Sequence, residues 1–184
     1  MNAALLLEYY ARIADAPDAV ARLRQFVLDL AVRGKLVEQD AGDDAVTEVL
    51  MAAKVKDFSK HSELVGWADA QLGQLLKFQY GKSLHAKERQ ENGAVPVFGS
   101  NGIVSYTHNA LTDKPSIIVG RKGSAGALNL CTVPSWTTDV AYFVEAPTYF
   151  SIQYLLLALS ALGLDQLGKG VKPGLSRSDA YALT

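Results

Sequence analysis

Four short glycine-containing loops carry side chains that could bind nucleic acid. They span residues 80–83 (YGKS), 98–102 (FGSNG), 120–126 (GRKGSAG) and 170–174 (GVKPG). Glycine lets backbone N–H groups approach a ligand closely, and Ser, Asn, Arg and Lys donate hydrogen bonds to phosphates and base edges. A plain surface turn explains any one of these loops, but four of them together favour nucleic-acid binding. The candidate binding residues are Tyr80, Lys82, Ser83, Gly99, Ser100, Asn101, Gly102, Arg121, Lys122, Gly123, Ser124, Lys169 and Lys172.

The 120–126 loop offers two cations of different kinds. The planar fork of Arg121 suits a base or a groove, whereas Lys122 acts as a point charge that suits a phosphate. Under the alternative interpretation, Arg121 packs against Tyr80 or pairs with Asp113 or Asp139.

The common arrangements of catalytic residues are missing from the sequence. No Lys has an acidic residue two positions before it, as a common type of metal-dependent nuclease requires, and no two prolines are adjacent, as an adenine methyltransferase would need. The three histidines lack metal-ligand spacing, so we expect no metal or cofactor. The P-loop spacing that ends at Lys169 has Gly170 in place of Ser or Thr. A stand-alone RNA- or nucleotide-binding module using the 120–126 loop stays open, because residues 118–123 resemble a KH loop.

The composition indicates one folded domain, with or without an appendage. The chain has 184 residues, of which 49% are hydrophobic and 20% charged. Its net charge of −1 is divided unevenly, with −4 over residues 1–70 and +3 over residues 71–184. Either this division is chance or the basic part meets an anion. The single Cys131, the acidic start and the short apolar runs lead us to expect a cytoplasmic protein without a signal peptide or membrane span.

An amphipathic helix should precede the basic part of the chain. Val20, Leu23, Phe26, Val27 and Leu30 recur at helical spacing, with Asp15 and Pro17 as a start signal and Gly34 as the stop. This apolar stripe either packs on the chain's own domain or pairs with a helix outside the chain. A second helix is predicted at 45–56, between linkers at 38–44 and 58–65.

From residue 66 onward the pattern predicts short strands. Apolar runs bounded by Gly and Pro occur at 75–78, 95–98, 103–106, 116–119, 127–131 and 140–144. A buried helix should follow at 151–162, and a last short helix should be capped by Ser176, with Asp179 completing a capping box. The prediction is therefore an α+β chain: a helical arm with linker at 1–65, and a strand-rich mixed α/β domain at 66–184.

Two regions resemble one half of the specificity subunit of type I restriction-modification enzymes. The first is 23–37 (LRQFVLDLAVRGKLV). The second runs from Trp67 to the end and includes 95–103 (VPVFGSNGI), 117–126 (IIVGRKGSAG) and 173–179 (PGLSRSD). The resemblance identifies residues 66–184 as a DNA target recognition domain, and the candidate residues above as DNA-binding ones.

The resemblance also implies partners for this chain. Such subunits are non-catalytic, read the two halves of a split duplex DNA site with two recognition domains, and direct a DNA adenine methyltransferase subunit and a restriction (motor-nuclease) subunit. Full subunits are about twice as long, so the chain is either a fragment or a half-length form. We expect the stripe Val20, Leu23, Phe26, Val27 and Leu30 to pair with partner helices, and self-association is a second way to cover the same stripe. A third hypothesis is a pure scaffold, in which the basic part has no role.

Overall fold

A computed structural model describes residues 9, 17–40, 42–43, 45–61, 64–168 and 174–184, and it divides the chain into units 1–41 and 42–184. This division lies earlier than the boundary expected after residue 65. Strand β1 (Phe58–Lys60) pairs antiparallel with β2 (Ala68–Ala70), and the amide of Val46, in α4 (Val46–Ala52), donates to the carbonyl of Gly66. The predicted 58–65 linker thus contains a strand, and its pairing ties residues before 65 to those after it.

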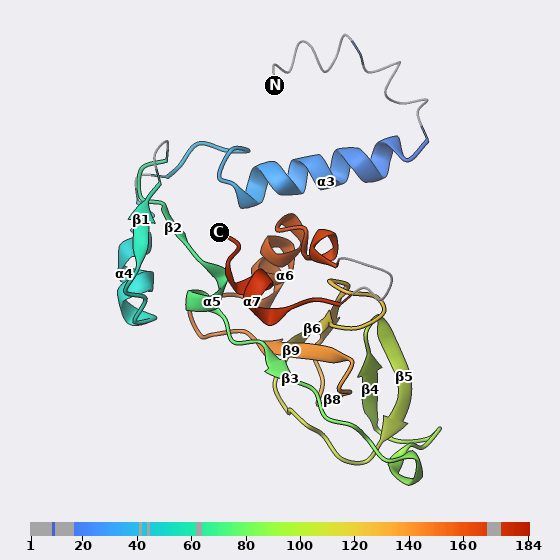
Figure 1. Ribbon diagram of the computed structural model, residues 1–184. Coiled ribbons are helices and arrows are strands. Elements are labelled where there is room, and N and C mark those ends of the chain that lie inside the picture. The colour runs from blue at the N-terminus through green and yellow to red at the C-terminus, as the bar shows by residue number, and fades with distance from the viewer. Residues whose placement is uncertain (1–8, 10–16, 41, 44, 62–63, 169–173) are drawn as a thin grey trace. The chain divides into compact units, whose positions relative to one another are not determined.

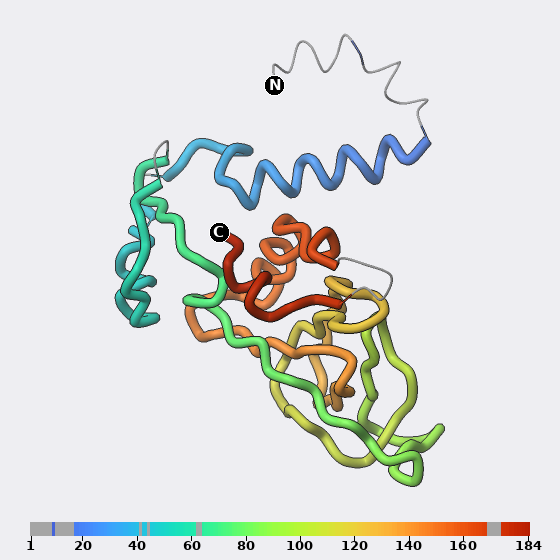
Figure 2. Tube along the Cα trace, viewed as in Figure 1, coloured from blue at the N-terminus to red at the C-terminus, as the bar shows by residue number. Residues whose placement is uncertain are grey.

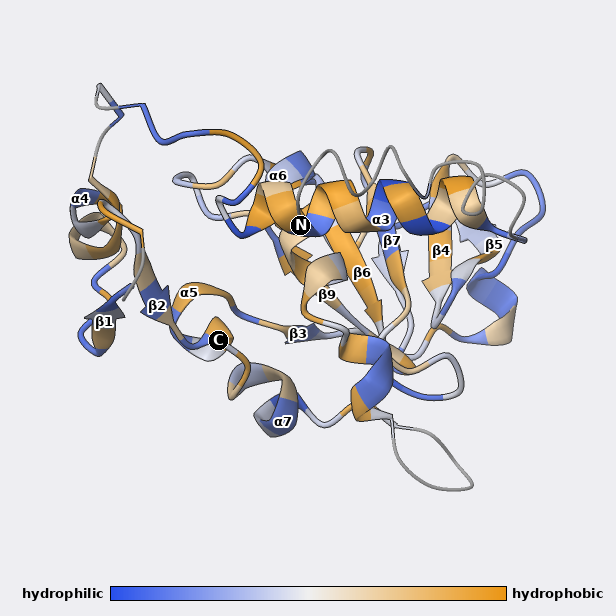
Figure 3. Cartoon of the chain, turned by 90° about the horizontal axis from the view of Figure 1, so that it is seen from above, coloured by the Kyte–Doolittle hydropathy of each residue, from blue (hydrophilic) through white to orange (hydrophobic). Residues whose placement is uncertain are grey.

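The first unit contains the predicted amphipathic helix, α3 (Ala19–Val32). It begins after Asp18, whose side chain makes no capping bond, and Gly34 follows its end with a φ of 64°. The expected start signal at Asp15 lies outside the described residues. No residue of α3 is buried, and Val20 is 65% exposed. Figure 3 shows the helix alternating between hydrophobic and hydrophilic turns.

The second unit is built on a four-stranded antiparallel sheet in the order β3-β9-β6-β7. Its strands are β3 (Gln79–Tyr80), β9 (Ala141–Glu145), β6 (Ser116–Gly120) and β7 (Leu128–Cys131). Because β6 is central and rich in β-branched residues, it is buried along its whole length. Strands were expected at 116–119, 127–131 and 140–144, and all three are confirmed.

Short helices cover one side of this sheet (Figure 1). They are α5 (Leu72–Leu75), α6 (Ile152–Ala161), η2 (Leu164–Leu167) and α7 (Arg177–Tyr181). Leu155 and Leu159 of α6 enter the same core as Ile117 and Val144. The helix predicted at 151–162 is present, but it is less buried than expected: only these two residues of α6 are buried, and its Tyr154 is 41% exposed.

Two local predictions were wrong. The strand expected at 75–78 is not formed: Leu75 is the last residue of α5, whose start carries a capping box of Gln71 and Gln74, residues 76–78 belong to no helix or strand, and β3 begins only at Gln79. The capping box expected at Ser176 is also missing, since its hydroxyl bonds to that of Ser178 instead.

A second sheet in the order β5-β4-β8 flanks the first. β4 (Val95–Gly99) and β5 (Gly102–Thr107) form an antiparallel hairpin, and β8 (Trp136–Thr137) runs parallel to β4. The short 3-10 turn η1 (Ala86–Glu88) precedes the hairpin. Within the described segments, every helix is too short or too polar to cross a bilayer.

The first prediction concerns Gly126, which lies in the loop between β6 and β7. Its φ is 80°, and a Cβ there would overlap the backbone of Leu164 and Asp165. Gly66 has a φ of 81° with nothing within 4 Å of such a Cβ, so Gly66→Ala is a control matched in backbone strain. That strain alone costs about 1–2 kcal/mol. Gly126→Ala should lower the free energy of unfolding in urea by about 1–3 kcal/mol more than the control. If both variants lose the same free energy of unfolding, close packing of η2 against the loop does not require glycine at position 126.

Candidate functional site

Two of the glycine loops meet at one carbonyl oxygen, that of Val140. The amides of Arg121 and Lys122 donate to it at 2.9 and 3.0 Å, and the Ser100 hydroxyl lies 3.3 Å from it. The same hydroxyl also donates to the carbonyl of Lys122. The 98–102 turn and the 120–126 loop are therefore fixed side by side.

The loop 80–83 reaches the same stretch of chain. The amide of Gly81 donates to Ala141 at 3.1 Å, and that of Lys82 donates to Thr137 at 2.9 Å. The indole N–H of Trp136 donates to the carbonyl of Lys82 at 2.8 Å. A Cβ at residue 81 would overlap the carbonyl of Thr138, so this close approach requires glycine. Three of the four predicted loops therefore converge on residues 137–141.

The fourth loop can be followed only at its end. Lys169 and Lys172 lie outside the described residues. Gly174 pairs with Lys122, and the amide of Leu175 donates to the carbonyl of Arg121 at 2.8 Å. In the tube trace the red segment before α7 accordingly runs beside the gold 120–126 loop (Figure 2).

Arg121 packs against Tyr80, which is the alternative position considered from the sequence. Its guanidinium carbon lies 5.0 Å from the ring centroid of Tyr80, and its Nη1 donates to the carbonyl of Asp139 at 3.0 Å. The side chain of Lys122 is 55% exposed, with its Nζ 4.0 Å from a carboxylate oxygen of Asp139. The loop therefore holds one cation against a ring and leaves the other exposed beside the carboxylate of Asp139.

Arg177, at the start of α7, was not identified from the sequence as a site residue. Its guanidinium carbon lies 4.9 Å from the same Tyr80 ring and 5.8 Å from that of Tyr181. We call Tyr80, Arg121, Tyr142, Arg177 and Tyr181 the Arg–Tyr cluster. The only hint in the sequence is that Arg177 belongs to the 173–179 segment that carried part of the family resemblance.

The rings of the Arg–Tyr cluster support the cations without neutralising them. Burial, and next the neighbouring Tyr80, raise the pKa of Tyr142 above its ordinary value, so its hydroxyl stays protonated. That hydroxyl donates to the carbonyl of Leu175 at 3.2 Å. Tyr80 packs edge-on against Tyr142, with 5.0 Å between ring centroids. Both arginines therefore face neutral aromatic rings.

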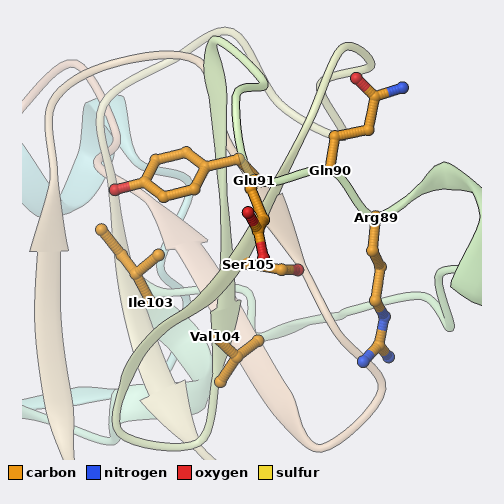
Figure 4. Close-up of a pocket in the computed structure, with 7 residues that line it drawn as sticks. Arg89, Gln90, Glu91, Ile103, Val104 and Ser105 are labelled. Carbon is orange, nitrogen blue, oxygen red and sulfur yellow. The ribbon is translucent and has the colours of Figure 1, made fainter.

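A groove of about 520 Å³ beside β5 is a weaker candidate. Figure 4 shows Arg89, Gln90 and Glu91 on one of its sides and Ile103 and Val104 on β5. Its single arginine is accompanied by a glutamate, so the groove has no excess of one charge. The described residues also contain no group of three or more metal-binding side chains. The loops around residues 137–141 remain the better candidate site.

Comparison with known proteins identifies the family to which these loops belong. The family model described as the type I restriction modification DNA specificity domain matches residues 64–172. This match confirms the resemblance found in the sequence. None of the curated proteins compared with the chain matches it.

Solved structures share the fold. The S subunit of a type I restriction-modification system from M. genitalium matches with a TM-score of 0.57 and 18% identity, over 62% of this chain and 32% of that one. A structure described for complex assembly and conformational transition of the type I R-M system matches with a TM-score of 0.54 and 15% identity, over 99% of this chain and 45% of that one. The HsdS subunit from Thermoanaerobacter tengcongensis matches with a TM-score of 0.50 and 13% identity, over 94% of this chain and 43% of that one. This chain thus spans less than half the length of each, and the likeness confirms the expected α+β class.

The second prediction tests the junction of the loops. Ser100→Ala removes the hydroxyl that bonds to Val140 and Lys122, so the free energy of unfolding should fall by about 1 kcal/mol. Ser124→Ala is the matched control, because Ser124 is exposed and lies in the neighbouring loop. Urea unfolding of both variants measures the difference. If the two variants lose the same stability, the Ser100 hydroxyl does not join the loops.

Proposed function

Because this chain belongs to the type I restriction modification DNA specificity domain family, we propose that it binds duplex DNA sequence-specifically through its converging loops. The observation that carries this proposal is that loops 80–83, 98–102 and 120–126 meet on residues 137–141. The loop tips can reach a ligand, since Lys82, Asn101, Lys122 and Ser124 are exposed. From the sequence alone we also propose Lys169 and Lys172 as DNA-binding residues, and both lie outside the described residues.

The geometry favours DNA binding by side chains and disfavours the binding of a nucleotide phosphate by backbone amides. In the 120–126 loop the amides of Gly120, Arg121, Lys122 and Gly126 already donate to backbone carbonyls. A phosphate cradle of the P-loop kind needs such amides free. The loop also joins two strands, whereas a KH loop joins two helices. Both facts weigh against the RNA- or nucleotide-binding alternative.

We further propose that α3 serves assembly and not DNA binding. Its apolar stripe is solvent-accessible, with Val20 at 65% and Leu23 and Val27 both at 39% exposure. Exposed apolar stripes at helical spacing are typical of helix-pairing surfaces. The proposed occupants are helices of the specificity subunit and its methyltransferase, with the restriction subunit joining the assembly. In this role the chain is non-catalytic, directs methylation and cleavage by its partners, and acts on DNA in the cytoplasm.

The third prediction tests Lys122 as a phosphate contact. Lys122→Gln should weaken binding to all duplexes alike and lower the slope of log affinity against log salt by about one. Lys114→Gln is the control, because Lys114 precedes the opposite end of β6 and pairs with Glu145 at 3.4 Å. Titration of fluorescent duplexes at several salt concentrations measures both slopes. Duplex binding with an unchanged slope in Lys122→Gln would contradict this role.

The fourth prediction tests the arm. Phe26→Asp places a charge in the apolar stripe and should weaken assembly with the methyltransferase subunit at least tenfold, which corresponds to about 1.4 kcal/mol. Gln25→Asp adds the same charge at an exposed neighbouring position of α3 and should leave assembly unchanged. Co-purification and analytical ultracentrifugation measure the effect. Intact assembly together with lost DNA binding in Phe26→Asp would reverse the roles we assign to the two units.

A further inference from the structure

We propose that Arg121 and Arg177, held together by the ring of Tyr80, form a binding site for phosphates of the DNA backbone. This inference rests on the proposed duplex binding and adds Arg177 to it. The guanidinium carbons lie 5.0 and 4.9 Å from one ring centroid, so two positive charges are kept near each other by a single neutral side chain.

The first argument is the missing counterion. In the described part of the chain, neither guanidinium has a carboxylate oxygen within 4.0 Å. Arg33, by contrast, pairs with Asp29 at 2.9 Å. Glu145 lines the same hollow as Arg177, but its oxygens already accept from Thr112 at 2.7 Å and face Lys114 at 3.4 Å. Two cations that contact the same ring without a counterion repel each other, and a bound anion would relieve that repulsion.

The second argument is the orientation of the two side chains. Nη1 of Arg121 donates a hydrogen bond to the carbonyl of Asp139 at 3.0 Å, and Nη1 of Arg177 donates one to the carbonyl of Phe78 at 3.5 Å. A guanidinium has five N–H donors, so both keep further donors for a ligand. The contact with the ring face holds each guanidinium in place, and phosphate oxygens bind to the donors that remain. Tyr80 is 47% exposed and both arginines are half-buried, so the cations can be reached from solvent although Tyr142 is buried.

The third argument decides between phosphate and base. A side chain that reads a base must extend from its loop into a groove, whereas both arginines are folded back onto rings and carbonyls of their own domain. A fixed pair of positive charges suits an anion whose position is the same for every sequence. The Arg–Tyr cluster would therefore set the register of the duplex, and the exposed tips of the loops would meet the bases.

The test uses the full chain and fluorescent duplexes of several sequences over a range of salt concentrations. Arg177→Gln and Arg121→Gln should each weaken binding to every duplex and lower the salt slope by about one. Arg177→Lys should keep the slope because it keeps the charge. Arg33→Gln, in α3, is the control for loss of an arginine, and thermal unfolding verifies that each variant is folded. An unchanged salt slope in folded Arg177→Gln, or a loss of affinity confined to duplexes of particular sequence, would overturn the phosphate site.

A second measurement separates this inference from the proposed function. Inorganic phosphate is titrated into the wild-type chain while the arginine Nε–H signals are followed by NMR. The signals of Arg121 and Arg177 should shift together, and the Arg121 shift should shrink in Arg177→Gln. If these shifts occur without any duplex binding, the anion site stands and the proposed DNA function fails. Duplex binding without the shifts refutes the site and leaves the proposed function intact.

Discussion

The carbonyl oxygen of Val140 is the acceptor on which the arrangement of the loops depends. It receives two consecutive amides of the 120–126 loop and lies within reach of the Ser100 hydroxyl of the hairpin turn. On either side of it, Asp139 accepts from Arg121 and Ala141 accepts from Gly81. The short stretch 139–141, at the start of β9, thus orders segments that are far apart in the sequence, and an unsatisfied backbone group there would be costly.

Aromatic rings, and not carboxylates, hold the cations of this surface in place. An ion pair would fix Arg121 and Arg177 equally well, but it would cancel the charge that an anion needs. A neutral tyrosine attracts a guanidinium through the face of its ring and leaves the net charge in place. The raised pKa of Tyr142 serves the same end, since a protonated hydroxyl adds no negative charge beside Arg121.

The strands could be predicted from the sequence because their signals are local. Apolar runs at 95–98, 103–106 and 116–119 lie between Gly and Pro residues, and each became a strand. The strand predicted at 75–78 is not formed because α5 includes Leu75 and pairing with β9 begins only at Gln79, a register that is set by residues distant in sequence. The loops were recognised from their glycines and cations, but their meeting at Val140 was not, since it depends on contacts distant in sequence. Arg177 was missed for the same reason: nothing near it in the chain signals that Tyr80 will be its neighbour.

Many of the hydrogen bonds that join the three loops run between main-chain atoms, and the side chains of Ser100, Arg121, Trp136 and Thr138 supply the others. Every amino acid except proline carries the same main-chain donor and acceptor. Exchanging Asn101, Lys122 or Ser124 would therefore alter the surface while the scaffold beneath it persists. A collection of chains randomised at these three positions would consist largely of folded molecules with different chemical faces. The domain is in this sense a support on which new binding preferences can be selected without redesigning its core.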